Sequence, residues 1–237
     1  MIHKMCWSLL ALLVLSIQVV HAEFVLQEGI VYSLNAEGRS LTRVDRHATK
    51  VSGNFYLKND RLYTLGTRNR RILVGRDVTE ISYPLFLRGS NLYLYDASNN
   101  KTYYVDRNIT QVANHYFLKG DRLYRVTLAS VQPQIRFITR GVTKTFDGTF
   151  LKRNTLFKVE ENRNLFHYIA NNVSHASADY YVREGRLYAL TSDRESVFIT
   201  AGVTDLEGRL FIKNNTLYSA VFGFGYQRLL PNMETLH

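Results

Sequence analysis

The chain repeats a unit of about 30 residues seven times, and this repeat constrains its fold more than any other feature. The clearest piece of the unit reads aromatic, aliphatic, base, two turn residues, one variable residue and Leu-Tyr, as in residues 55–63. The copies begin at Phe24, Phe55, Leu85, Tyr116, Thr149, Tyr180 and Leu210. A unit of this size cannot bury its own apolar face, so the copies must stack on one another.

Each copy is predicted to consist of short β-strands. The first four residues alternate sides as a strand does, and a turn follows that is rich in Gly, Asn and Asp, such as Asn59-Asp60. The Leu-Tyr pair lies on a second strand that is covered on both faces. A third strand comes next, and a small aliphatic residue followed by Thr or Ser, as in Val78-Thr79, is expected to start a short fourth strand. The fold class is therefore all-β.

Two segments carry a resemblance to a known family. Residues 31–38, Val-Tyr-Ser-Leu-Asn-Ala-Glu-Gly, and residues 185–190, Gly-Arg-Leu-Tyr-Ala-Leu, resemble the repeats of β-propeller proteins of the quinoprotein-like type. The resemblance implies one seven-bladed β-propeller domain over residues 23–237. It implies no cofactor, because no cofactor-binding residues can be carried over. It also implies a scaffold role, since cofactor-free propellers of this type commonly assemble other macromolecules.

The short repeat limits the size of each blade. Four-stranded blades usually need about 40 residues, so we expect small blades of three to four strands. A β-solenoid is the alternative to a closed ring.

Residues 1–22 are predicted to be a signal peptide. Lys4 precedes an apolar run over residues 9–20, and Ala22 closes a Val-x-Ala site, so cleavage is expected before Glu23. A membrane anchor is the alternative, but the run is short for a bilayer. The protein is therefore expected to be secreted or periplasmic. The only cysteine of the sequence, Cys6, would leave with the signal.

The strongest candidate site is a set of basic residues that end the first strand of each copy. If that strand is innermost, as in propellers generally, their side chains form a ring at a channel mouth and attract anions. The alternative is a basic side chain that packs its stem on an aromatic ring and leaves its charge in water. The set comprises Lys58, Arg88, Lys119, Lys152, Arg183 and Lys213, with Gln27 in the first copy.

The net charge of the chain and a second set of basic residues also favour an anionic partner. The sequence holds 30 Lys and Arg against 20 Asp and Glu, a net charge of +10. A second basic set precedes the Val-Thr turn at Arg46, Arg76, Arg107 and Arg140. Such an excess favours anionic partners or simply keeps the protein in solution.

Catalytic and metal-binding patterns are missing from the sequence. The histidines His47, His115, His167, His175 and His237 are scattered over different copies, and no spacing suggests a metal site. No Gly-x-Ser-x-Gly or phosphate-cradling pattern occurs. Four Asn-x-Thr/Ser sequons are possible glycosylation sites, at Asn100, Asn108, Asn172 and Asn214.

These observations favour an exported, non-catalytic binding or scaffold module. It would use a basic channel mouth or blade edge to contact a protein or a polyanion, namely an acidic polysaccharide, lipopolysaccharide or nucleic acid. Two alternatives remain open: a hydrolase or lyase that acts on acidic glycans at a channel site, and a structural component of an envelope or matrix. Acidic residues that converge on one mouth would favour the enzyme.

Overall fold

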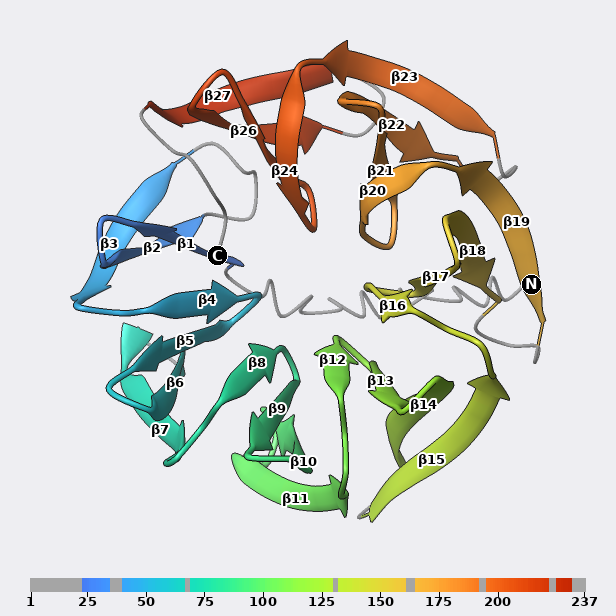
Figure 1. Cartoon of the computed structure of the whole chain (residues 1–237). Helices are drawn as coiled ribbons and strands as arrows, with labels where there is room; N and C mark the ends of the chain where they lie inside the picture. Colours follow the sequence, from blue (N-terminus) through green and yellow to red (C-terminus); the bar gives the residue numbers. More distant parts are fainter. Residues whose placement is uncertain are drawn as a thin grey trace, which may run out of the picture.

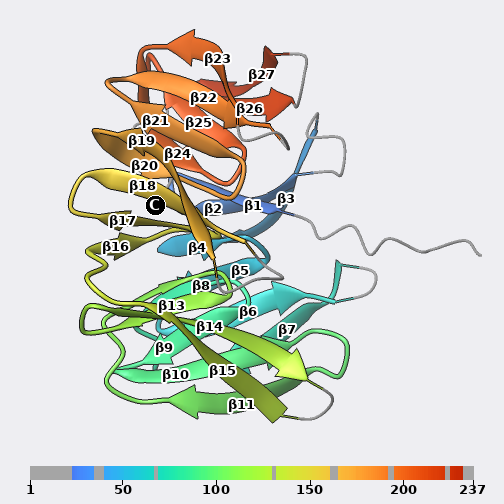
Figure 2. The ribbon, with the colours of Figure 1, turned by 90° about the vertical axis from the view of Figure 1, so that its right-hand side faces the viewer.

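The computed structural model describes residues 23–34, 40–66, 69–129, 132–160, 165–191, 195–221 and 225–231. These residues form small antiparallel sheets that are arranged as seven blades around an axis, with almost no helix (Figure 1). The side view shows the sheets stacked as successive layers of the ring (Figure 2). The predicted seven-bladed β-propeller is confirmed. The predicted signal peptide, residues 1–22, lies outside the described residues.

The blades are numbered in chain order. Blade 1 contains β1 (Glu23–Gln27), β2 (Ile30–Leu34) and β3 (Leu41–Arg46). Blade 2 contains β4 (Lys50–Ser52), β5 (Phe55–Lys58), β6 (Arg61–Leu65) and β7 (Arg71–Gly75). Blade 3 contains β8 (Glu80–Ser82), β9 (Leu85–Arg88), β10 (Asn91–Asp96) and β11 (Lys101–Asp106). Blade 4 contains β12 (Gln111–Ala113), β13 (Tyr116–Lys119), β14 (Arg122–Ala129) and β15 (Gln132–Thr139).

The remaining blades repeat this pattern. Blade 5 contains β16 (Lys144–Thr145), β17 (Thr149–Lys152), β18 (Thr155–Val159) and β19 (Phe166–Asn171). Blade 6 contains β20 (Val173–Ala176), β21 (Tyr180–Arg183), β22 (Arg186–Leu190) and β23 (Ser196–Ala201). Blade 7 contains β24 (Val203–Glu207), β25 (Leu210–Lys213), β26 (Thr216–Val221) and β27 (Gly225–Pro231). Blades of three to four strands are thus confirmed within the described residues.

The order of strands within a blade corrects one expectation. Blade 2 runs β4-β5-β6-β7, and β4 lies nearest the axis (Figure 1). The first strand of the repeat, residues 55–58, is therefore second from the centre rather than innermost. The short strand after Val78-Thr79, expected as the fourth of its own copy, is instead the innermost strand of the next blade.

The Val-Thr signature is the link that joins two blades. In the link between blades 2 and 3, the amide of Val78 donates to the carbonyl of Asp60 in the preceding hairpin, at 3.1 Å. The amide and the hydroxyl of Thr79 both donate to the carbonyl of Leu87 in the following blade, at 2.9 and 3.4 Å. The small polar residue thus satisfies the backbone of the next blade, which explains why Thr or Ser recurs there.

The core lies between the blades. Buried residues of neighbouring blades pack face to face, as when Phe55 of blade 2 meets Phe86 of blade 3 with ring centroids 6.2 Å apart. One such cluster joins blade 7 to blade 1, where Val25 packs with Ile212 and Leu217. Gln27 also donates to the carbonyl of Pro231 at 3.2 Å. The described residues therefore close into a ring, which excludes an open solenoid.

Within the described residues, no helix has the length and the apolar character needed to cross a bilayer.

Candidate functional site

One edge of every blade carries an excess of cations. In an antiparallel blade the end of the second strand, the start of the third and the end of the fourth meet at the same edge. The hairpin turns and the links between blades therefore share one face of the ring. We call it the basic face, defined by its cations Arg46, Lys58, Arg61, Arg76, Arg88, Arg107, Lys119, Arg122, Arg140, Lys152, Arg153, Arg183, Arg186 and Lys213.

Acidic residues on the basic face are half as numerous. They are Glu28, Asp45, Asp60, Asp77, Asp106, Asp121 and Glu184. The first halves of the inner strands add the cations Lys50 and Lys144 and the anions Glu80 and Asp205, whose charges cancel. Most arginines of the basic face are exposed, among them Arg61, Arg107 and Arg140. Most of the net charge of the chain thus lies on one face.

The six cations predicted to form a ring lie at equivalent places, but they do not line the channel. Because their strand is second from the centre, four of them reach the outermost strand of the preceding blade, each to a partner thirteen residues earlier. Their contacts are Lys58 to Asp45 at 2.9 Å, Lys119 to Asp106 at 2.9 Å, Lys152 to the Thr139 hydroxyl at 2.8 Å, and Lys213 to the Thr200 hydroxyl at 2.7 Å. Whether these cations bind an anion stays a prediction.

The other two members of the set are arginines. Arg183 lies 4.0 Å from Glu184 in its own hairpin. Arg88 lies over the ring of Tyr93, with 4.7 Å from Cζ to the ring centroid. The partner position thirteen residues before Arg88 is Gly75, and a Cβ added there would lie 3.1 Å from an Arg88 Nη. Glycine therefore makes room for this guanidinium.

Asp45 is the most strongly held carboxylate at a blade junction. It accepts hydrogen bonds from Lys58, from Arg71 at 2.9 Å and from the Tyr56 hydroxyl at 3.1 Å. Burial alone would raise its pKa, but these bonds and the amide of Arg46 outweigh burial and hold the pKa of Asp45 well below its usual range. This carboxylate is structural, because its oxygens are committed to blades 1 and 2.

The second predicted basic set is exposed. Arg46, Arg76, Arg107 and Arg140 all lie at the end of an outermost strand or in the link that follows it. The same position holds Asn171 in blade 5 and Ala201 in blade 6, so the cations cover one sector of the basic face.

The four sequons lie in exposed turns. Asn108, Asn172 and Asn214 are on the basic face, and Asn100 is on the opposite edge, where the Tyr95 hydroxyl donates to its side chain at 3.0 Å. All four asparagines have positive φ. Their use as glycosylation sites stays a prediction.

The opposite edge holds an acidic pair near the channel. Glu207 ends the inner strand β24, and Glu23 begins β1. Burial raises the pKa of Glu207 to about 8, and the charge of Glu23 adds to this rise. Burial also raises the pKa of Glu23, although Arg209 lies 3.3 Å away and opposes the rise. No sequence pattern indicates this pair, because the two residues come from opposite ends of the repeat array.

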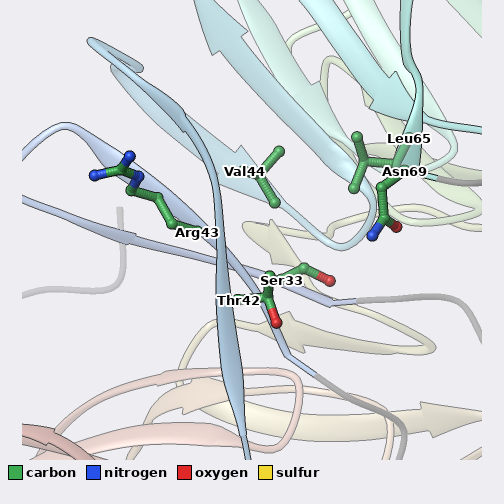
Figure 3. Close-up of a pocket in the computed structure, with 6 residues that line it drawn as sticks. All are labelled: Ser33, Thr42, Arg43, Val44, Leu65 and Asn69. Carbon is green, nitrogen blue, oxygen red and sulfur yellow. The ribbon is translucent and has the colours of Figure 1, made fainter.

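A surface cavity of about 180 Å³ lies between blades 1 and 2, away from the basic face. Ser33, Thr42, Arg43, Val44, Leu65 and Asn69 line it. Figure 3 shows Val44 and Leu65 approaching each other from the two blades, whereas the side chain of Arg43 points away from them. The lining residues offer hydroxyl and amide groups to a ligand but include no carboxylate.

Metal ligation finds no support in the described part of the chain, where no three His, Cys, Asp or Glu side chains gather closely enough to hold an ion. His175 instead lies 3.7 Å from Asp205, and His167 lies 3.8 Å from Glu160.

Comparison with protein-family models and with curated proteins finds no match for the chain. Solved structures do match. PorZ, described as an essential bacterial surface component of the type-IX secretion system of human oral-microbiomic Porphyromonas gingivalis, matches with a TM-score of 0.52 and 15% identity over 89% of this chain and 33% of that chain. Apo AztD from Citrobacter koseri matches with a TM-score of 0.48 and 10% identity over 91% of this chain and 95% of that chain. The chain thus spans a third of PorZ, and the likeness shows the fold alone.

Proposed function

We propose that the chain is an exported, non-catalytic binding module that holds an anionic macromolecule against its basic face. The observation that supports this function is the concentration of cations at one edge of the blades, where their fields add. Export rests on the predicted signal peptide. A scaffold role follows from the resemblance to quinoprotein-like propellers, a subtype that remains part of the proposal.

The geometry decides which cations should carry the binding. Lys58 and Lys119 are bonded to Asp45 and Asp106, so charge reversal there would break blade junctions as well as remove charge. Within the described residues, no hydrogen bond or ion pair engages the side chains of the exposed Arg46, Arg107, Arg140 and Arg186. A polyanion that contacts several of them would release bound counterions, which makes its affinity depend steeply on salt.

The test compares two variants of equal charge. One changes Arg46, Arg107, Arg140 and Arg186 on the basic face to Gln, and the other changes Arg43, Lys101, Arg136 and Arg228, which are exposed on outer strands away from that edge. Binding to immobilised heparin, lipopolysaccharide and DNA is measured over a series of salt concentrations. We expect the first variant to elute from heparin at clearly lower salt than the second. Equal elution of the two variants would show that only net charge matters, and absence of binding by the wild type would reject the function.

A second candidate function has one observation in its favour. The carboxyl of Glu207 is held protonated near neutral pH beside the carboxyl of Glu23, and a raised pKa is what a general acid in glycan cleavage requires. Under this alternative, wild-type protein releases new reducing ends from an acidic polysaccharide, and Glu207→Gln releases none. Equal release by both proteins, or none by the wild type, rejects it.

A further inference from the structure

We propose that the junction of blades 2 and 3 is a binding site for an anionic sugar unit, in which Arg88 and Arg76 hold the anionic group and Tyr104 supports the sugar ring. The inference rests on the proposed function and deepens it, because it names one site on the basic face and the chemical class that the site recognises.

Arg88 is exceptional among the cations at the blade junctions. At the equivalent junctions Lys58, Lys119, Lys152 and Lys213 each bond a carboxylate or hydroxyl thirteen residues earlier. Arg88 meets Gly75 instead, and within the described part of the chain its guanidinium has no hydrogen bond or ion pair. Its Nε is enclosed and unsatisfied, a costly state for a charged group. Because no internal oxygen takes the donors of Arg88, they remain available to the oxygens of a ligand.

The orientation of Arg88 is fixed by aromatic rings. Its Cζ lies 4.7 Å from the centroid of Tyr93 and 5.7 Å from that of Phe86, and these two rings stack on each other at 5.4 Å. Stacking holds the planar guanidinium in one pose, and a fixed fork of donors binds a carboxylate or sulfate in two places at once.

A second cation lies beside this place. Arg76 directly follows Gly75 and is exposed in the link between the blades. The junctions of blades 1–2 and 3–4 also have an arginine in the link, but there an aspartate, Asp45 or Asp106, precedes it and pairs with the lysine. At the junction of blades 2 and 3 Gly75 takes the place of this aspartate, so Arg88 has no carboxylate partner of this kind.

An exposed ring extends the site toward the rim. Tyr104 lies opposite Tyr93 on the outermost strand β11, and the two rings meet edge to face with centroids 5.8 Å apart. Tyr104 is 53% exposed. The contact with Tyr93 orients the ring, while more than half of Tyr104 stays accessible to a ligand. The C–H groups of a sugar are attracted to the negative face of such a ring.

Charge and shape together choose the ligand class. An inorganic anion would use the arginines but not Tyr104, and a neutral sugar would use Tyr104 but not the arginines. A uronic acid or a sulfated sugar uses both. Nucleic acid also offers anions and stacking groups, but a chain exported as proposed meets acidic glycans as its main polyanions.

The test uses a heparin tetrasaccharide as the probe and titration calorimetry as the measurement. We expect Arg88→Gln to weaken binding at least about tenfold. Gly75→Asp should weaken it to a similar extent, because the new carboxylate would pair with Arg88 as Asp45 pairs with Lys58. The matched control is Lys152→Gln, at a junction whose cation already has an internal partner, and it should bind within about twofold of the wild type.

Two further arms separate the possible ligands. Tyr104→Ala should weaken the tetrasaccharide about fivefold or more and leave the binding of inorganic sulfate unchanged. If Arg88→Gln binds the tetrasaccharide like the wild type, the inference is wrong. Salt-dependent binding of long heparin by the wild type would then still support the proposed function. If Tyr104→Ala weakens a single-stranded DNA oligonucleotide as much as the tetrasaccharide, the site is not selective for sugar, and the inference is equally overturned. Circular dichroism melts of each variant check that it folds.

Discussion

Asp45 lies in blade 1, and its carboxylate joins blades 1 and 2 by accepting hydrogen bonds from side chains of blade 2. Its side chain is 9% exposed, and it accepts from Lys58, Arg71 and Tyr56. A hydrogen bond to a charged acceptor contributes about 1.5–3 kcal/mol net of the bonds to water that it replaces. Such a carboxylate stabilises the fold only while it is ionised.

We therefore predict that Asp45→Asn lowers the free energy of unfolding by about 2 kcal/mol at pH 7. The pKa of Asp45 is depressed in the folded state, so its contribution is present above the unfolded pKa of about 3.9 and is lost as the pH falls below it. Urea unfolding of both proteins at pH 7 and pH 3 measures the effect. A difference as large at pH 3 as at pH 7 would contradict the assignment.

The pKa of Glu207 is shifted in the opposite direction from that of Asp45, so its effect on stability changes with pH in the opposite sense. Its pKa of about 8 is raised by burial first and by Glu23 second, so the folded state favours the neutral carboxyl. Its contribution is complete below the unfolded pKa of about 4.3 and is lost as the pH rises toward 8. We predict that Glu207→Gln has little effect on the urea midpoint at pH 5 and raises it at pH 9. The reverse order of effects would refute the raised pKa.

At the scale of the strand, the cation that ends β13 and the one that ends β17 occupy equivalent places with different partners. Lys119 pairs with the carboxylate of Asp106, and Lys152 donates to a hydroxyl and lies 4.7 Å from the centroid of Phe166. We predict that Lys119→Met costs about 1 kcal/mol of unfolding free energy, because it leaves Asp106 without its partner in a partly exposed junction. Lys152→Met should cost less than half of that. Equal losses in urea unfolding would show that the partner is irrelevant.

The strands themselves could be predicted from the sequence, but their order in the blade could not. The turn residues identified the hairpins correctly: Asn59 and Asp60 both have positive φ, as a tight hairpin requires. A periodic sequence does not show where one blade ends and the next begins, since every starting point gives the same period. The sequence therefore assigns the strand after Val78-Thr79 to the wrong blade, and the expectation of Lys58 at the channel mouth depends on that assignment.

Part of the candidate site was also predictable. The basic residues and their regular spacing are visible in the sequence, and so are the aspartates thirteen residues before Lys58 and Lys119. Their pairing could not be inferred without knowing that the end of one outer strand lies beside the second strand of the next blade. The approach of Glu23 and Glu207 depends on ring closure alone.

At the scale of the whole molecule, blade-to-blade packing predicts one cooperative unfolding transition. Leu62 of blade 2 and Leu187 of blade 6 are fully buried, and each belongs to a cluster that joins its blade to the next. We predict that Leu62→Ala and Leu187→Ala each cost about 3 kcal/mol. In calorimetry, each should shift a single transition of the entire ring to lower temperature. A second peak, confined to one set of blades, would disprove this coupling.

The links between blades have a mechanical consequence. Residues 76–79 leave blade 2 at its rim and enter blade 3 near the axis, so within the described residues each of blades 2 to 7 receives its innermost strand from the tail of the preceding sequence copy. The boundaries between sequence copies therefore fall inside sheets, and the boundaries between sheets fall inside sequence copies. A single backbone scission in such a link leaves the sheets on both sides intact, so the two fragments stay together through the packing between blades and part only when the protein is denatured.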